Sequence, residues 1–185
     1  MVVAVRADNG SACENNTPGS SADGAAKTTA DNSKESAIRE AVRKKAWEKE
    51  RERVLCGKGT RDWTIAQQEE LIRTKHVTGF EGQHMLSAKK YPQFMADPDN
   101  IQFVTYAEHL HGCHRGDWKN PSSGWLDPNT GEMVPIVGDR VVPPPEIELT
   151  NKINPNNIAD LILSGVKSGR DSNVAKSRKR IKNKS

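Results

Sequence analysis

The chain has 185 residues, of which 34% are hydrophobic, 5% aromatic and 28% charged, and its formal net charge is +4. This length allows one domain with appendages, and so few apolar residues cannot bury every segment in a core. The composition therefore excludes a chain that is folded throughout, while the mild positive charge permits a nucleic-acid partner without requiring one.

The first segment, 1–33, is almost entirely small and polar, which predicts a disordered linker. A charged helix leading into the domain is predicted over 34–56, where Asn32 and Glu35 have the spacing of a capping box. Its apolar stripe is narrow, so we expect the helix to lean on the domain rather than form its centre. Its alternating charges favour a solvated face over nucleic-acid contact.

The folded domain is predicted over 57–133. Its first elements are a short helix near 65–73, begun by a cap in which Thr64 pairs with Gln67, and a strand over 75–80.

A long loop with several turn signals is predicted over 85–99, followed by a return strand over 101–105. Thr105 and Glu108 can then cap a helix that continues to His114. The predicted order is therefore strand, long loop, strand and short helix.

The remainder, 134–185, is predicted to be an extended Pro-rich spacer and a basic tail. Pro143, Pro144 and Pro145 favour extended backbone, and one weak helix is predicted over 155–164. From residue 167 onward there are eight basic residues and one acid, which is typical of a flexible tail.

Cysteine usage and hydropathy indicate the setting in which the protein works. Cys13, Cys56 and Cys113 are an odd number at wide spacing, so reduced thiols are expected rather than a disulfide framework. No apolar run is long enough to span a membrane, and the opening residues are too short for a secretory signal. We therefore expect no membrane insertion, and export without a classical signal peptide if the protein leaves its cell.

Histidines are concentrated in one part of the chain. Four of the five lie within 31 residues, namely His84, His109, His111 and His114. Such crowding of imidazoles in a polar segment is typical of a metal site. Fifteen residues separate His84 from Asn100, and eight separate Asn100 from His109.

Hydrolysis of a phosphodiester would need two kinds of histidine, because a base bound to metal has no lone pair with which to accept a proton. His84 stands apart and suits the base. His109 is the first candidate ligand and His114 the second, since positions three to five apart lie on roughly one helix face. Cys113 and His111 rank behind them.

Two further polar residues complete the candidate site. The Asn100 amide can both donate to and accept from backbone groups, so it can pin the loop and orient the carbonyl that holds the base. Arg115 is a candidate phosphate ligand, although an ordinary surface arginine is an equal alternative.

The stretch 79–118 resembles the HNH/endonuclease VII superfamily of nucleases. Within it, the chain is most similar to the nuclease toxin domains named for a Gly-His-His signature, which end many bacterial polymorphic toxins. The residues that carry the resemblance are Gly79-Phe80-Glu81-Gly82-Gln83-His84-Met85, Glu108-His109-Leu110 and His114-Arg115-Gly116-Asp117-Trp118. The resemblance implies an α+β fold: a small ββα-metal (HNH/His-Me finger) core with flanking helices, to which the composition adds disordered arms. It also implies that His84 is the general base, Asn100 fixes the loop, and His109 and His114 hold the metal.

One position departs from the signature, which has a second histidine directly before the base where this chain has Gln83. A glutamine carbonyl binds divalent ions weakly. The site therefore works with fewer protein ligands and more water, or His111 or Cys113 compensates, or activity is impaired. One divalent ion is expected, with Mg²⁺ or Mn²⁺ favoured and Zn²⁺ or Ni²⁺ as alternatives.

The resemblance implies a metal-dependent endonuclease, acting on DNA in preference to RNA, that serves as a toxin domain with a cognate immunity protein. Such a protein would be produced in a bacterium, delivered without a classical signal peptide, and active in the cytoplasm of the target cell. One alternative is a non-catalytic zinc module in which Cys113 joins His109 and His114 to bind nucleic acid. The enzyme is favoured because structural zinc sites normally have four ligands at compact spacing, and no CxxC pair is present. A basic adaptor acting through residues 167–185 is the third interpretation.

Overall fold

The computed structural model describes residues 29–137 and 140–166. Residues 1–28 of the predicted linker and the predicted basic tail from 167 lie outside the described residues. Helices and small antiparallel sheets make up the described part, which is the mixed α+β class predicted from the sequence.

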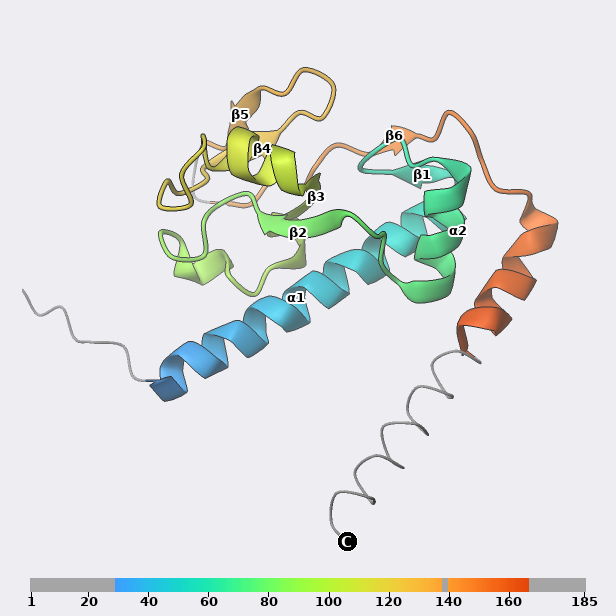
Figure 1. Cartoon of the computed structure of the whole chain (residues 1–185), viewed down its shortest axis with the longest axis horizontal. Helices are drawn as coiled ribbons and strands as arrows, with labels where there is room; N and C mark the ends of the chain where they lie inside the picture. Colours follow the sequence, from blue (N-terminus) through green and yellow to red (C-terminus); the bar gives the residue numbers. More distant parts are fainter. Residues whose placement is uncertain (1–28, 138–139, 167–185) are drawn as a thin grey trace, which may run out of the picture.

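The longest helix is α1, Thr29–Leu55, which runs along the hairpin of β2, Phe80–His84, and β3, Ile101–Thr105 (Figure 1). It begins inside the segment predicted as linker. The expectation that this helix only leans on the domain is wrong, because the rings of Trp47 and Phe103 stack with their centroids 3.7 Å apart in the main core. The apolar stripe of α1 is narrow, but the Trp47 indole buries more apolar surface than a small side chain can.

A buried carboxylate ties α1 to the segment that follows it. Glu50 is fully buried, and its Oε1 accepts hydrogen bonds of 2.7 Å from the Thr60 backbone and from the Trp63 indole. The guanidinium of Arg53 pairs with the other oxygen at 3.2 Å. A carboxylate is tolerated in the core because both of its oxygens are paired.

The next helix, α2, Ile65–Thr74, confirms the predicted cap. The Thr64 side chain accepts from the Gln67 backbone at 3.3 Å, and the Gln67 side chain accepts from the Thr64 backbone at 3.0 Å. The strand predicted over 75–80 is wrong. Lys75 instead ends α2 in the left-handed region with φ 61°, and β2 begins only at Phe80.

The β2–β3 hairpin is antiparallel, with Gln83 opposite Gln102 and His84 opposite Ile101. β3 lies where the sequence predicted it. The helix that follows is π-helical over Glu108–Cys113, and its predicted cap is present: the Thr105 backbone donates to the Glu108 carboxylate at 2.7 Å.

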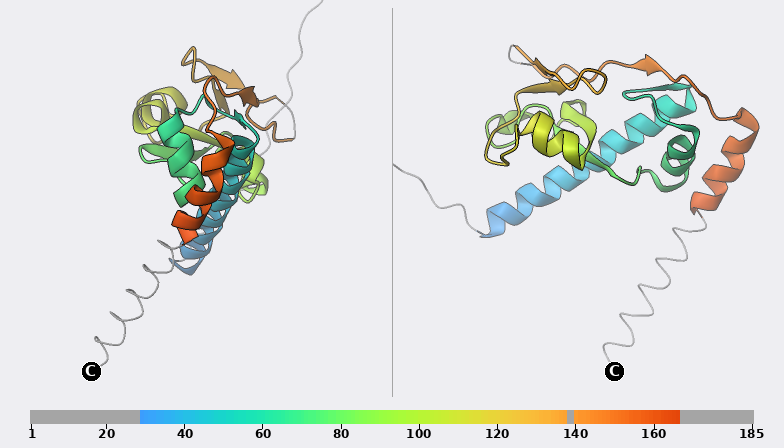
Figure 2. Two further views of the ribbon diagram at one scale, coloured as in Figure 1. Left: turned by 90° about the vertical axis from the view of Figure 1, so that its right-hand side faces the viewer. Right: turned by 45° about the horizontal axis from the view of Figure 1, so that its top comes forward.

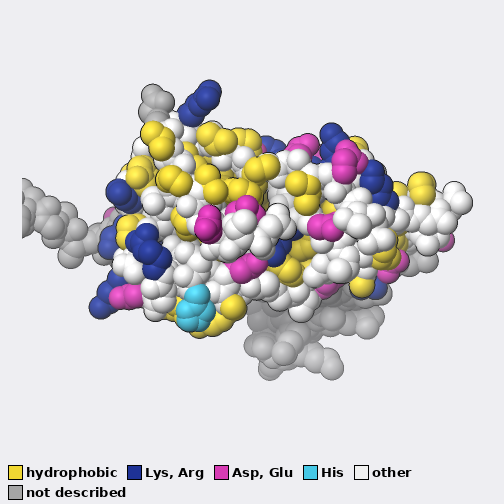
Figure 3. All heavy atoms as spheres, turned by 90° about the horizontal axis from the view of Figure 1, so that it is seen from above, with side chains coloured by type: hydrophobic (Ala, Val, Ile, Leu, Met, Phe, Trp, Pro, Cys, Tyr) yellow, Lys and Arg dark blue, Asp and Glu magenta, His cyan; other side chains and the backbone are white. Residues whose placement is uncertain are grey.

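A second sheet lies beyond this helix and consists of β4, Gly124–Leu126, and β5, Met133–Pro135. Leu126 packs with Val104 and Cys113 in a small separate apolar cluster. Val134, Val137 and Val142 are exposed in this part of the chain. Figure 3 shows hydrophobic side chains gathered on the face of the molecule that is uppermost in Figure 1.

The segment predicted as a spacer contributes to the domain. β6, Ile147–Glu148, pairs antiparallel with β1, Lys58–Gly59, and Leu149 and Ile153 are buried in the main core. The predicted weak helix is present over 155–166, beside α2 in both views of Figure 2. Parts of the segment 134–166 therefore pack against the domain predicted over 57–133. Within the residues that the structure describes, no helix is both long and apolar enough to cross a membrane.

Candidate functional site

The candidate site straddles β2. Side chains alternate between the faces of a strand, so Glu81 and Gln83 point one way and Gly82 and His84 the other. Gly82 faces α1, where an added Cβ would lie 3.0 Å from the Arg43 side chain. Glu81 and Gln83 face the π-helix and both contact His109. The candidate base His84 and the two residues that contact His109 therefore lie on opposite faces of the same strand.

The His84 ring has a defined tautomer. Its Nε2 lies 3.0 Å from the Met95 carbonyl oxygen, and because a carbonyl can only accept, Nε2 carries the proton. Nδ1 then keeps its lone pair. Burial lowers the pKa of His84, the nearby positive charges of Arg39 and Arg43 lower it further, and the Met95 carbonyl acts in the opposite direction. The ring is therefore neutral at pH 7 and able to accept a proton.

Asn100 closes the loop between His84 and β3, and it is completely buried. Its Oδ1 accepts from the Leu86 backbone at 2.8 Å, and its Nδ2 donates to the carbonyls of Leu86 at 3.0 Å and Phe94 at 3.1 Å. Phe94 directly precedes Met95, whose carbonyl holds the His84 ring. The hydrogen bonds expected of a loop-fixing asparagine are thus present.

His109 has an acceptor at each ring nitrogen. Nδ1 lies 2.8 Å from the Glu81 carboxylate and Nε2 lies 2.6 Å from the Gln83 Oε1. The Gln83 amide is oriented by its Nε2, which donates to the His84 carbonyl at 2.9 Å. Burial lowers the pKa of His109 and His114 adds to this, although the Glu81 carboxylate opposes them.

A neutral His109 has a single N–H, which it can donate to Glu81 or to Gln83 but not to both. With the proton on the Glu81 side, the ring lone pair and the Gln83 oxygen converge. A cation can bind both of these lone pairs at once.

His114 lies beside His109, with their ring centroids 5.0 Å apart. In the π-helix the His114 backbone donates to the His109 carbonyl at 3.1 Å, so residues five apart share a face. The Nδ1 of His114 lies 2.6 Å from the Asn120 carbonyl, which leaves its Nε2 with the lone pair. Trp118 packs against both imidazoles, at centroid distances of 5.0 and 5.1 Å.

This donor set is compatible with one divalent cation. Two imidazole nitrogens and the Gln83 oxygen are available, while Glu81 and the Asn120 carbonyl hold the rings of His109 and His114 in orientation. Few protein ligands imply that water completes the shell.

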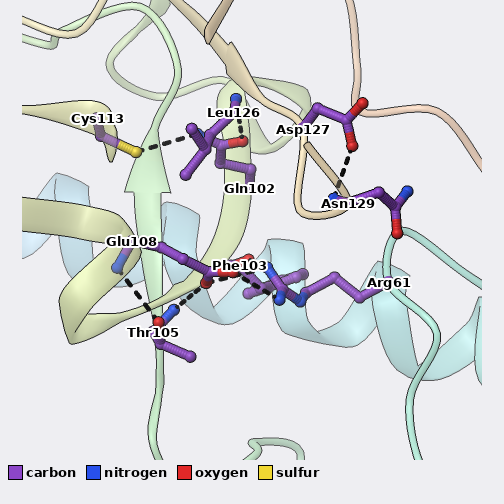
Figure 4. A network of polar contacts seen from close by, with 9 residues as sticks. All are labelled: Arg61, Gln102, Phe103, Thr105, Glu108, Cys113, Leu126, Asp127 and Asn129. Atoms are coloured by element: carbon purple, nitrogen blue, oxygen red, sulfur yellow. Dashed lines mark hydrogen bonds and ion pairs between the residues drawn. The ribbon is translucent and has the colours of Figure 1, made fainter. Parts of the chain in front are cut away.

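The other predicted ligands lie elsewhere. Cys113 is completely buried in the cluster with Val104 and Leu126, and its sulfur accepts from Gln102 at 3.5 Å (Figure 4). Burial, assisted by the charge of Glu108, raises the pKa of the Cys113 thiol to about 12, so the thiolate needed for a metal ligand is disfavoured.

His111 is exposed on the π-helix. Among residues 29–137 and 140–166, no group of three or more His, Cys, Asp or Glu side chains could hold a metal. Compensation for Gln83 by Cys113 or His111 stays a prediction, which the burial of Cys113 and the exposure of His111 do not favour. Arg115 is exposed in a turn, with φ 51°.

The structure shows roles for two charged residues, Glu81 and Arg61, that the sequence analysis did not assign to the site. Side chains alternate along a strand, so Glu81 lies on the same face of β2 as Gln83. This relation was missed because the strand was predicted to end at residue 80. Arg61 makes a double ion pair with Glu108, at 2.9 and 3.2 Å, and donates to the Phe103 carbonyl at 3.1 Å (Figure 4). Burial raises the pKa of Glu108, but the hydrogen bonds from Arg61 and Thr105 outweigh it and leave the pKa lowered. The start of the π-helix is thus anchored.

A cavity of about 800 Å³ lies between α1 and β2. Gln83, His84 and His109 line it together with Arg39 and Arg43 of α1. The candidate base and a candidate ligand therefore open into one continuous space.

Residues 32–105 match the model of a family described as "GHH signature containing HNH/Endo VII superfamily nuclease toxin". This confirms the resemblance predicted from the motifs. The matched region includes nearly all of α1, together with His84 and Asn100. It ends before His109, so the placement of the two candidate imidazole ligands rests on the geometry described above.

Parts of the chain also resemble teneurins. It is 34% identical over 64 residues to Teneurin-3 of Danio rerio, 42% identical over 60 residues to Teneurin-m of Drosophila melanogaster, and 33% identical over 75 residues to Teneurin-4 of Homo sapiens. These alignments cover 34%, 32% and 40% of this chain, respectively, but only 2% or 3% of each teneurin. The chain therefore spans a very small part of the length of these relatives.

Proposed function

We propose that this protein is a metal-dependent HNH-type endonuclease that hydrolyses phosphodiester bonds in DNA. The observation that carries the proposal is the His84 ring, which is neutral, held through Nε2 and free at Nδ1, within the region that matches a nuclease toxin family. In this proposal β2, the long loop, β3 and the π-helix form the ββα-metal core.

His84 acts as the general base. Its Nδ1 takes a proton from water, and the Met95 carbonyl stabilises the resulting imidazolium through the Nε2 proton. Asn100 supports this step indirectly, because it holds the backbone that carries this carbonyl.

His109, His114 and Gln83 would hold the divalent cation, with water completing its shell. When bound, such a cation neutralises the scissile phosphate and the departing oxygen. Few imidazoles and more water favour Mg²⁺ or Mn²⁺ over tightly held Zn²⁺. Arg115 remains a candidate phosphate ligand beyond the π-helix.

The biological setting proposed is that of a bacterial polymorphic toxin domain, delivered into a target cell and restrained in its producer by an immunity protein. The family description supports the toxin assignment. The apolar surroundings of Cys113 argue against the alternative of a non-catalytic zinc module, which would need this thiol as its third ligand.

The test is a plasmid-nicking assay with Mg²⁺, Mn²⁺, Zn²⁺ or EDTA, with an RNA substrate in parallel. His84→Ala should lower the cleavage rate about 10²- to 10⁴-fold, the usual contribution of a general base. Metal affinity and melting temperature should change little, since His84 ligates nothing.

His111→Ala is the matched control, because it removes an exposed imidazole from the π-helix. Cleavage by His84→Ala at the parental rate would refute the base assignment. Full activity in EDTA would refute the metal requirement.

A further inference from the structure

Three cations of α1 border the candidate site, and Lys44 is the most exposed of them. Arg39, Arg43 and Lys44 line the same cavity of about 800 Å³ as His84 and His109. The positive charges of Arg39 and Arg43 also contribute to the lowered pKa of His84.

The close approach of α1 to β2 depends on Gly82. A Cβ at this position would lie 3.0 Å from Arg43 Cγ and 3.2 Å from Arg43 Cδ. The absence of a side chain lets the Arg43 stem pack against the strand at Gly82, one residue from Gln83 and two from His84. Lys49 also pairs with Asp99, next to Asn100, so α1 is attached to the loop that holds the base.

The cations in this cavity have weak partners. Glu40 is shared by Arg43 at 3.0 Å and Lys44 at 3.5 Å, and its side chain is 54% exposed. Surface ion pairs of this kind contribute little to stability, so an anion that binds more strongly can displace the carboxylate. Arg39 pairs with Glu35 at 3.4 Å, while its buried Nε lacks a hydrogen-bond partner among the residues that the structure describes.

We propose that α1 is the substrate-binding wall of this site, on which Arg39, Arg43 and Lys44 bind the backbone phosphates of a DNA strand next to the scissile bond. Guanidinium groups match phosphate geometry and form strong charge-assisted hydrogen bonds with it. Glu40 competes with these phosphates for Arg43 and Lys44. The family match, which begins at residue 32, includes this wall. The inference rests on the proposed nuclease function and replaces the expectation that this face is merely solvated.

Binding is measured with a fluorescently labelled DNA duplex, without divalent metal, in a His84→Ala background that separates binding from cleavage. Arg43→Gln should weaken binding about tenfold, the loss expected for one charged hydrogen bond. The slope of log affinity against log salt should become shallower by about 0.9 for each phosphate contact removed.

Two variants on the same helix act as matched controls. Lys45→Gln removes an exposed cation that does not line the cavity, and it should leave affinity and salt slope close to those of the parent. Glu40→Gln should tighten binding, because it releases Arg43 and Lys44 from their shared carboxylate. If Glu40 had a purely structural role, Glu40→Gln would weaken DNA binding instead.

The outcomes separate the two proposals. If the protein with His84 intact cuts DNA but Arg43→Gln and Lys45→Gln bind alike, the wall is refuted and the nuclease assignment stands. If Glu40→Gln weakens binding while its melting temperature is unchanged, the wall is also refuted. A protein that neither cuts nor binds DNA refutes both proposals.

Discussion

Two regions of this molecule are stabilised in different ways. The main core between α1, α2 and the hairpin is built from packed apolar side chains, including Trp47, Trp63 and Phe103. The region from His84 to the π-helix has only a small apolar cluster and relies on hydrogen bonds to buried polar groups such as Asn100. The first region sets whether the chain folds, and the second sets how accurately a few polar atoms are placed.

The largest effect on stability is expected in the main core. Trp47→Ala should lower the free energy of unfolding by about 3–5 kcal/mol, since the stacked indole is almost completely buried. Trp118→Ala, which removes the same side chain from a position that is 49% exposed, should cost much less. Urea unfolding of both variants measures the difference, and equal losses would contradict the proposed division between the regions.

In the polar region, Asn100→Ala should cost about 1–3 kcal/mol because it leaves the buried backbone N–H and carbonyl of Leu86 without their partner. Its effect on catalysis should be larger. A shift of the Met95 carbonyl misplaces the His84 ring, and we expect kcat to fall about 10²-fold with KM little changed.

Single-turnover cleavage at a temperature where Asn100→Ala is fully folded distinguishes the two effects. Loss of stability with parental kcat would show that Asn100 serves the fold alone.

The smallest effect expected is on the pH dependence of stability. The pKa of His84 is lowered in the folded protein, so the unfolded chain binds more protons in the pH range just below 6.5. Stability should therefore rise as pH rises through this range and fall as pH decreases.

One titrating proton changes stability by at most about 1.4 kcal/mol per pH unit, and the His84→Gln variant should show a flatter profile. Melting temperatures between pH 5 and 7.5, measured in EDTA, provide the comparison. Parallel profiles for the two proteins would mean that His84 does not titrate differently on folding.

Local signals in the sequence were sufficient for several elements. The cap of α2, the extent of β3 and the Thr105–Glu108 cap depend on residues close together in the chain, and all three were predicted. The strand over 75–80 was misplaced because its apolar residues can equally fill a loop: Val77 is completely buried but lies between α2 and β2. The role of α1 was underestimated because stacking of Trp47 on Phe103 joins residues far apart in the sequence.

For the candidate site, spacing alone brought forward His84, Asn100, His109 and His114. The sequence could not show that Glu81 and Gln83 both contact His109, since this requires the correct strand register. It also ranked Cys113 by regular α-helical spacing, which the π-helix does not follow.

By itself, the sequence determined the α+β class, the nuclease-like motif and the separation of a lone histidine from a cluster, because these follow from residue type and short-range order. Only the tertiary structure decided which nitrogen of His84 is free, which donors converge with His109, and which cations of α1 face the cavity. These features depend on contacts between distant segments, where a one-residue change of register or helix pitch turns a side chain to the opposite face.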